Sequence, residues 1–281
     1  MNNSRIIGLI MVLILLLTTM TSCLNGEVEE EDRIETVAAD NQDLILPVYY
    51  VKFTDHNEYL VREEHQAPYT EDVYMAAMEQ LIKGKPVTAG ASRVLPDNTV
   101  IHNITVINGE MTVDFSGEVL QANVGSTGEE LGIASIVNTL TEFPGIDSVS
   151  FMVDGKIDDT VMSWWGHVGL YEQPFKRDLS VVVEPAIWVT QPSPGQKVTT
   201  PLTVSGSAMV FEATVCARIV DSAGKELVGE FTNAAAGAPE RGDFTMSLDF
   251  STNADSGKLI VYCEDARDGG ERDVVEVPII F

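Results

Sequence analysis

The stretch "NTVIHNITVINGEMTVDFS", residues 98–116, carries the clearest local fold signal in the chain. Asn108-Gly109 is the preferred sequence for a two-residue type I′ turn, and segments rich in β-branched residues flank it on both sides. The pattern therefore predicts a β-hairpin. Its position between two segments with helical periodicity makes it the centre of an α+β unit.

The first of those segments is "TEDVYMAAMEQLIKGK", in which apolar residues recur every three to four positions and predict one buried helical face. Thr70 can cap its start, and Gly84 can supply the position after its end. A second helix is expected to open at Ser126, with Glu129 completing a capping box, and to end before Pro144.

Strands are expected on the outer sides of these helices, at about residues 46–53, 58–65 and 147–155. The resulting order is strand, helix, hairpin, helix, strand. This order predicts an α+β domain in which two helices pack on a mixed sheet.

The helical periodicity disappears near residue 186, and three prolines follow between Gln191 and Pro201. Short strands separated by turn signals then recur at intervals of about 8–15 residues, which is typical of an antiparallel β-sandwich. The chain is therefore expected to contain two folded domains.

A carboxylate interrupts one of these expected strands, in "SGSAMVFEATVCARIVD". Burying an unpaired carboxylate costs several kcal/mol, so Glu212 is expected to have a partner. On a strand it would share a face with Cys216 and Arg218. We expect a structural carboxylate that pairs with Arg218 or Arg272, or that accepts backbone N–H bonds at a strand edge.

The N-terminus has the order of a signal peptide, with Arg5, an apolar run and then small residues. The run is shorter than the ~17–25 residues of a membrane-spanning helix. It ends in "TTMTSC", which resembles the bacterial lipobox, so residues 1–22 are expected to be a lipoprotein signal peptide and Cys23 the site of lipid attachment. An ordinary signal peptide with an incidental cysteine is the alternative.

The composition is acidic. Lys and Arg number 17 against 43 Asp and Glu, a net charge of −26, so nucleic acid is not an expected partner. Residues 23–46 are polar and acidic without apolar periodicity, and are expected to form a flexible tether.

Several segments of the sequence are similar to known protein families. "LVREEH", "AAMEQLIKGKP", "LPDNTVIHNITVINGEMTVDFSGE" and "IVNTLTEFPGIDSVSFMVDGK" resemble the GerMN domain of bacterial sporulation and germination lipoproteins, over residues 47–178. The resemblance implies a fold similar to ring-building α+β modules and a non-catalytic envelope protein. The founding member carries the domain twice and this chain once, so its particular partner is not carried over.

The second domain resembles the immunoglobulin-like domain that is associated with spore-germination proteins, over residues 186–281. The segments that carry this resemblance are "IWVTQPSPGQKVTTPLTVSGSAMVFEATVCARIVD" and "DARDGGERDVVEVPI". Cys216 and Cys263 fall in two of its strands. In an oxidising compartment they form either a disulfide across the sandwich or two buried thiols.

Three further features of the sequence are candidate functional sites. The four histidines lie in no nucleophile or zinc motif, so neither catalysis nor a cofactor is expected. Asp265, Asp268, Glu271 and Asp273 offer oxygen ligands for calcium, but nearby arginines favour a solvated or salt-bridged turn. The aromatic group of Trp164, Trp165, His167 and Tyr171 is either a sugar-stacking surface or a cover over the domain core.

Together these features predict a membrane-anchored, extracytoplasmic lipoprotein without catalytic activity. Its membrane contact is the lipidated Cys23, and its expected partners are envelope proteins or the cell wall. The alternative is a glycan-binding module, for instance for peptidoglycan, that uses the aromatic group.

Overall fold

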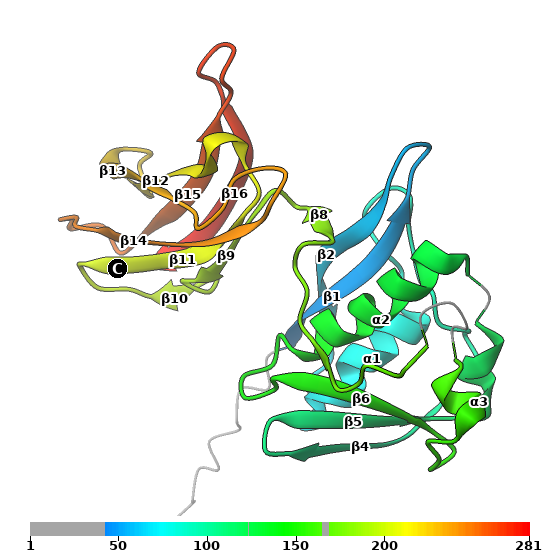
Figure 1. Cartoon of the computed structure of the whole chain (residues 1–281). Helices are drawn as coiled ribbons and strands as arrows, with labels where there is room; N and C mark the ends of the chain where they lie inside the picture. The colour runs from blue at the N-terminus through cyan, green and yellow to red at the C-terminus, as the bar shows by residue number, and fades with distance from the viewer. Residues whose placement is uncertain (1–42, 123, 165–168) are drawn as a thin grey trace, which may run out of the picture. The chain divides into compact units, whose positions relative to one another are not determined.

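The structure, a computed structural model, describes residues 43–122, 124–164 and 169–281 (Figure 1). The α+β domain contains strands β1 (Leu44–Phe53), β2 (Glu58–Ala67), β3 (Ala91–Ser92), β4 (Ile101–Ile107), β5 (Glu110–Phe115), β6 (Ser148–Val153), β7 (Phe175–Lys176) and β8 (Val182–Glu184). Its helices are α1 (Val73–Lys83), η1 (Gly117–Gln121, a 3₁₀ helix), α2 (Ser126–Leu140) and α3 (Asp159–Met162).

The strands of this domain form two sheets, where the sequence had predicted one mixed sheet. Their strand orders are β3-β1-β2-β8 and β4-β5-β6-β7. Each is mixed, because β2 pairs with β8 and β5 with β6 in parallel, while the remaining pairs are antiparallel. The α+β class is confirmed, and the number of sheets is corrected.

Helix α2 packs against both sheets of this domain. It contacts β1 and β2 of one sheet and β6 and β7 of the other. Its buried residues therefore lie almost all around the helix from its third residue onward, as is usual for a helix inside a core. The buried set is Gly128, Glu129, Leu131, Gly132, Ile133, Ser135, Ile136, Val137, Asn138, Thr139 and Leu140.

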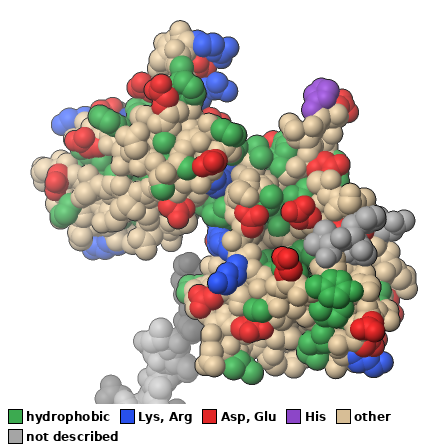
Figure 2. All heavy atoms as spheres, viewed as in Figure 1, with side chains coloured by type: hydrophobic (Ala, Val, Ile, Leu, Met, Phe, Trp, Pro, Cys, Tyr) green, Lys and Arg blue, Asp and Glu red, His purple; other side chains and the backbone are tan. Residues whose placement is uncertain are grey.

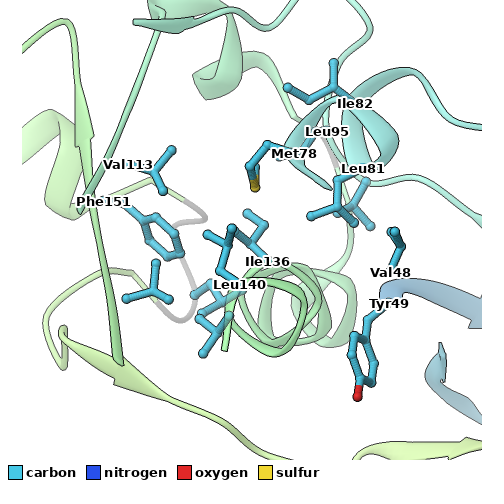
Figure 3. Close-up of a cluster of buried hydrophobic side chains, with 14 of the residues drawn as sticks. Val48, Tyr49, Met78, Leu81, Ile82, Leu95, Val113, Ile136, Leu140 and Phe151 are labelled. Carbon is cyan, nitrogen blue, oxygen red and sulfur yellow. The ribbon is translucent and has the colours of Figure 1, made fainter. Parts of the chain in front are cut away.

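The core between the sheets is apolar and closely packed. Met78, Leu81 and Ile82 of α1 approach Ile136 and Leu140 of α2 (Figure 3). Strand residues from both sheets complete this cluster, among them Val48, Tyr49, Val113 and Phe151. This is the buried helical face that the periodicity of residues 70–85 predicted.

The helix ends differ from the sequence expectation. The side chain of Asp72, rather than Thr70, caps α1 by accepting a bond from the Met75 N–H. Ser126 is the first residue of α2 and its N-cap is Gly125, so no capping box forms. At Gly84 the backbone is extended, and a Cβ there would lie 2.4 Å from the Gln80 carbonyl oxygen.

The second domain is an all-β sandwich, as predicted. Its elements are β9 (Ile187–Gln191), β10 (Gln196–Lys197), β11 (Leu202–Ala208), η2 (Phe211–Ala213), β12 (Thr214–Asp221), β13 (Glu226–Asn233), β14 (Gly242–Leu248), β15 (Ser256–Glu264) and β16 (Glu271–Ile280). The sheets have the orders β10-β16-β15-β12-β13 and β14-β11-β9, and they enclose a second apolar core. Only the short β10–β16 pair is parallel among the described strand pairs of this domain.

Arg241 stabilises the start of the sandwich. The Arg241 guanidinium lies 4.0 Å from the centre of the Trp188 ring and donates to the carbonyl oxygens of Pro185 and Ala186. Burial lowers the pKa of Arg241 to about 10. The cation therefore holds the backbone just before β9 against the ring.

The hairpin that opened the sequence argument is confirmed. β4 and β5 pair antiparallel, and the turn residues Asn108 and Gly109 have φ values of 52° and 84°. Both lie in the left-handed region that a type I′ turn requires.

Replacing Gly109 with Ala should destabilise the α+β domain by about 1 kcal/mol or more, since an L side chain at this φ is strained. Its Cβ would also lie 2.5 Å from the Asp147 Oδ2 atom. Thermal unfolding of residues 43–281 measures the loss. Asn108→Gly is the control, because glycine also suits that turn position, and an equal loss in both variants would contradict this account.

Candidate functional sites

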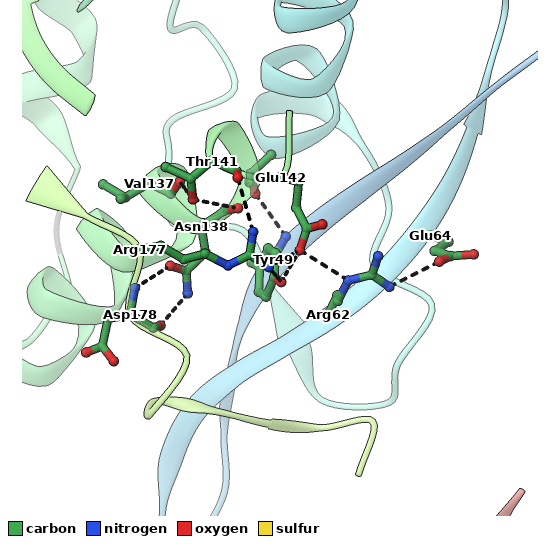
Figure 4. Close-up of polar contacts among 10 residues, drawn as sticks. Tyr49, Arg62, Glu64, Val137, Asn138, Thr141, Glu142, Arg177 and Asp178 are labelled. Carbon is green, nitrogen blue, oxygen red and sulfur yellow. Dashed lines mark hydrogen bonds and ion pairs between the residues drawn. The ribbon is translucent and has the colours of Figure 1, made fainter. Parts of the chain in front are cut away.

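A buried network of charged and polar groups joins both sheets of the α+β domain to the end of α2 (Figure 4). The Tyr49 hydroxyl donates to Glu142 Oε1 at 2.5 Å, and Arg62 Nε donates to the same oxygen at 3.4 Å. Arg177 also donates to Glu142 and, at 3.1 Å, to the Tyr49 hydroxyl. A second oxygen, on Glu64, lies 3.1 Å from Arg62 Nη1.

The charges of this network keep its carboxylate ionised. Burial alone would raise the pKa of Glu142, but the Arg62 and Arg177 guanidinium groups hold it below its ordinary value. Burial and the neighbouring Glu142 charge raise the pKa of the Tyr49 hydroxyl, which stays protonated and acts as a donor. Its charged groups are paired with one another, so we interpret the network as one that holds these segments together.

The side chains of α2 also bond to the backbone of β1. Ser135 Oγ donates to the Tyr49 carbonyl at 2.5 Å, and the Tyr49 N–H donates to Thr139 Oγ1 at 3.0 Å. Asn138 forms a similar two-way pair with the backbone of Asp178. The edge of β1 is therefore closed by helix side chains at this point.

A second buried carboxylate holds a loop. Glu63 accepts the backbone N–H groups of Val87 and Thr88 at 2.9 and 2.8 Å, and His65 Nε2 lies 2.7 Å from it. These bonds lower the pKa of Glu63 although burial opposes them. Because Glu63 binds two successive backbone N–H groups, it anchors the segment after α1.

The structure corrects part of the predicted aromatic surface. Trp164 is 3% exposed and packs edge-on against Phe115 and Phe151, so it belongs to the core. Tyr171 is 67% exposed. Trp165 and His167 lie outside the described residues. A sugar platform built on two adjacent exposed tryptophans is therefore not formed by Trp164, and the covering role applies to it.

Glu212 is not the strand residue that its sequence context suggested. It lies in the η2 turn before β12, is exposed, and has a φ of 52°. Arg218 and Arg272, its two expected partners, pair with Glu271 and Asp265 instead. The backbone carbonyl of Glu212 accepts a bond from Asn233 Nδ2 at 3.3 Å. Its structural contribution therefore comes from the main chain.

The two cysteines of the sandwich are free thiols, which corrects the disulfide alternative. Cys263 lies in the core with Val261 and Leu259, whereas Cys216 alternates with the core residues of β12. Cys216 is opposite Tyr262, one position away from Cys263, so the two sulfur atoms point to opposite faces of one sheet.

The acidic loop of the sandwich contains ion pairs. Asp265 accepts from Arg267 Nη2 at 2.7 Å and from Arg272 Nη1 at 3.2 Å. Hydrogen bonds from Arg267 lower the pKa of Asp265 to about 2. Within residues 43–122, 124–164 and 169–281, no group of three or more His, Cys, Asp or Glu side chains is placed to hold a metal ion.

The proposed lipid site, Cys23, lies outside the described residues. Among those that are described, no helix is long and apolar enough to cross a membrane.

Models of known protein families match both domains. A family model described as "Sporulation and spore germination" matches residues 47–159, and one described as "Immunoglobulin-like domain of bacterial spore germination" matches residues 186–270. The first domain is therefore similar to the domains of the sporulation and germination family, and the second is similar to the immunoglobulin-like domain of bacterial spore germination. This confirms the predicted resemblance and supports a role related to sporulation.

Individual relatives are similar over part of the chain. The spore germination protein GerM of Bacillus subtilis (strain 168) is 29% identical over 132 residues, which are 45% of this chain and 35% of that protein. The chain thus matches about a third of the length of this relative.

Solved structures give similar partial matches. The first GerMN domain of GerM from Bacillus subtilis is 29% identical, with a TM-score of 0.34 over 40% of this chain and 84% of that one. The tandem GerMN domains of the same protein are 18% identical, with a TM-score of 0.39 over 75% and 63%. A putative lipoprotein from Clostridium perfringens is 22% identical, with a TM-score of 0.30 over 42% and 79%.

Replacing Glu142 with Gln should lower the free energy of unfolding at pH 7 by roughly 2–4 kcal/mol, because two guanidinium groups lose their buried counter-charge. The pKa of Glu142 is lowered in the folded state, so the stability it contributes is present above its ordinary value of 4.5 and is lost as the pH falls below it. The difference from the native chain should therefore shrink towards pH 3, as measured by urea unfolding.

Glu130→Gln is the matched control for this prediction, since Glu130 is an exposed residue of the same helix. It should change the free energy of unfolding by less than about 0.5 kcal/mol. A Glu142→Gln loss that persists undiminished at pH 3 would contradict the charge account.

Residues 43–281, purified without reductant, should contain two titratable thiols after denaturation, one each from Cys216 and Cys263. Adding dithiothreitol should leave the melting temperature unchanged, because no bond in the sandwich is reduced. A thiol count of zero that rises on reduction would show a disulfide and contradict the opposite-face arrangement.

Proposed function

We propose that this protein is a lipid-anchored, extracytoplasmic and non-catalytic module that binds another component of the bacterial envelope during sporulation or germination. The observation that carries the proposal is the presence, in one chain, of two domains whose family descriptions both refer to spore germination or sporulation. Each domain by itself would give a weaker indication.

The proposed anchor is supported by the order of residues at the N-terminus. Arg5, an apolar run and "TTMTSC" precede Cys23 in the order of a lipoprotein signal peptide. The tether predicted over residues 23–46 overlaps the start of β1 at Leu44, so the part before this strand would separate the folded domains from the bilayer, as an acidic segment that repels itself and anionic lipids.

The absence of catalysis is proposed from the way the buried ionisable groups are used. The carboxylates of Glu63 and Glu142 are saturated by backbone or arginine donors inside the α+β domain. An enzyme site usually presents a perturbed group to a cleft where substrate can reach it. In the described residues, these groups instead hold secondary-structure elements together.

Deleting the gene in the bacterium that encodes this chain tests the sporulation role. Fewer heat-resistant spores, or a slower fall in optical density on germination, are expected in the deletion strain. The unmodified gene should restore the native values. Native counts and germination rates in the deletion strain would contradict the proposal.

Cys23→Ala tests the anchor separately. The native protein should sediment with membranes and partition into detergent, whereas the variant should appear in the medium or the soluble fraction. Ser22→Ala is the control, since the lipobox accepts small residues before the cysteine. A Cys23→Ala chain that still partitions into detergent would contradict lipid attachment at this residue.

A further inference from the structure

Strand β4 is an open edge of the β4-β5-β6-β7 sheet (Figure 1). It pairs with β5 on one side, and no described strand pairs with its other side. Five of its 7 residues are Ile, Val or Thr, and it contains no Lys, Arg, Asp, Glu or Pro. β-Branched residues favour extended backbone, and an unpaired edge of this kind is a template for another strand.

The free part of this edge is also apolar. Ile107 is 69% exposed and Val106 is 41% exposed, although both are large hydrophobic residues. The register of the hairpin shifts between Ile101 and Asn103, whereas Ile104 to Ile107 pair with β5 without interruption. A regular, exposed and uncharged strand segment therefore faces solvent.

Two other stretches of strand backbone that lack a strand partner are protected. The Tyr49 backbone on the edge of β1 is bonded by Ser135 and Thr139 of α2. The edge strand β13 of the sandwich carries Glu226 and Glu230. Charges and covering helices are the usual devices that prevent unwanted strand pairing. Ile104 to Ile107 of β4 carry no charged side chain, and no described side chain bonds to their backbone, so this part of the edge is suited to receive another strand.

Carboxylates border this edge. In the hairpin register Glu110 lies opposite Ile107 and Asp114 lies opposite Asn103, on the face away from the buried Met111 and its neighbours. Glu110 accepts a bond from the Ser150 hydroxyl, and Asp114 accepts one from a backbone N–H. Among the described residues, neither forms an ion pair with Lys or Arg.

These charges indicate the chemistry of the incoming strand. A strand added to β4 would lie about two strand spacings, roughly 9–10 Å, from β5. Long Lys and Arg side chains on that strand would extend across part of this distance, towards the carboxylates of Glu110 and Asp114. Acidic side chains would be repelled, and the net charge of −26 disfavours a second copy of this chain.

We propose that the outer edge of β4 is a docking site for an extended segment of another protein, in which apolar residues alternate with Lys or Arg. The segment adds as a further strand of the sheet, its backbone pairing with β4 and its basic side chains lying on the face of Glu110 and Asp114. This inference rests on the proposed interaction function and names the class of its partner.

The test uses two synthetic peptides and isotope-labelled residues 43–281. One peptide alternates lysine and valine over seven residues, and the other has glutamate in place of every lysine. The lysine peptide should shift the amide signals of Ile104 to Ile107 and slow their hydrogen exchange. The glutamate peptide should bind at least tenfold more weakly, and raised salt should reduce this difference.

Two variants separate charge from edge pairing. The double variant Glu110→Lys, Asp114→Lys should weaken binding of the lysine peptide about tenfold, while Glu230→Lys, a charge reversal on β13, should leave it unchanged. Ile107→Lys should also weaken binding, because it places a like charge on the edge itself. Thermal unfolding shows that each variant is folded.

The proposal would be overturned by equal binding of both peptides, or by amide shifts that lie outside β4 and its neighbours. It would also be overturned if the protein self-associated in sedimentation and Ile107→Lys abolished this association, because the edge would then bind a second copy of the chain. These outcomes are independent of spore counts. A deletion strain with native sporulation would contradict the proposed function and leave the peptide result standing.

Discussion

One buried carboxylate fixes how the parts of the α+β domain meet. Glu142 follows α2 directly and is bound by Arg62 of β2, Arg177 after β7 and the Tyr49 hydroxyl of β1 (Figure 4). A buried charge is tolerated only while its partners stay in place. A shift of Arg62 or Arg177 would remove part of the charge that compensates Glu142, and a shift of Tyr49 would remove a hydrogen bond to it, so the network favours this arrangement of the three segments.

The position of α2 between two sheets explains its polar buried residues. A helix on the outside of a sheet buries one stripe, but this helix is enclosed on several sides. Ser135, Asn138 and Thr139 are therefore buried together with their hydrogen-bonding groups. Each is satisfied by backbone of another segment, at Tyr49 or Asp178. At Tyr49, next to the short stretch where β3 pairs with β1, polar side chains of this helix bond to the backbone of β1 in place of a strand.

The sequence contained enough local information for the hairpin, the helices and the change to an all-β domain. The Asn108-Gly109 turn and the periodicity of residues 70–85 depend on neighbours in the chain, so they could be predicted. The division into two sheets depends on which strands meet at long range. Because β1 and β2 do not pair with β5 and β6, the strand order alone gave the wrong number of sheets.

The site residues were harder to predict for the same reason. Trp164 lies in an irregular segment, where no periodicity shows which aromatic ring turns towards Phe115 and Phe151. Glu212 and Ala213 both have left-handed backbone, with φ values of 52° and 58°. Non-glycine residues rarely adopt this conformation, so it is not expected from the sequence. The strand therefore begins only at Thr214, and Glu212 lies exposed in the turn before it.

The distribution of satisfied and unsatisfied groups favours binding over catalysis. Three ionisable side chains that are buried or nearly so in the α+β domain, Arg62, Glu63 and Glu142, are occupied by internal partners. Strand β4, by contrast, has no described strand on its outer side, and the carboxylates of Glu110 and Asp114 lie on the neighbouring strand β5. A surface of this kind recognises extended backbone and charge, which are properties of a protein segment rather than of a small substrate. In the proposed binding role, the buried polar groups hold the fold together and the backbone of β4 supplies the hydrogen bonds for association.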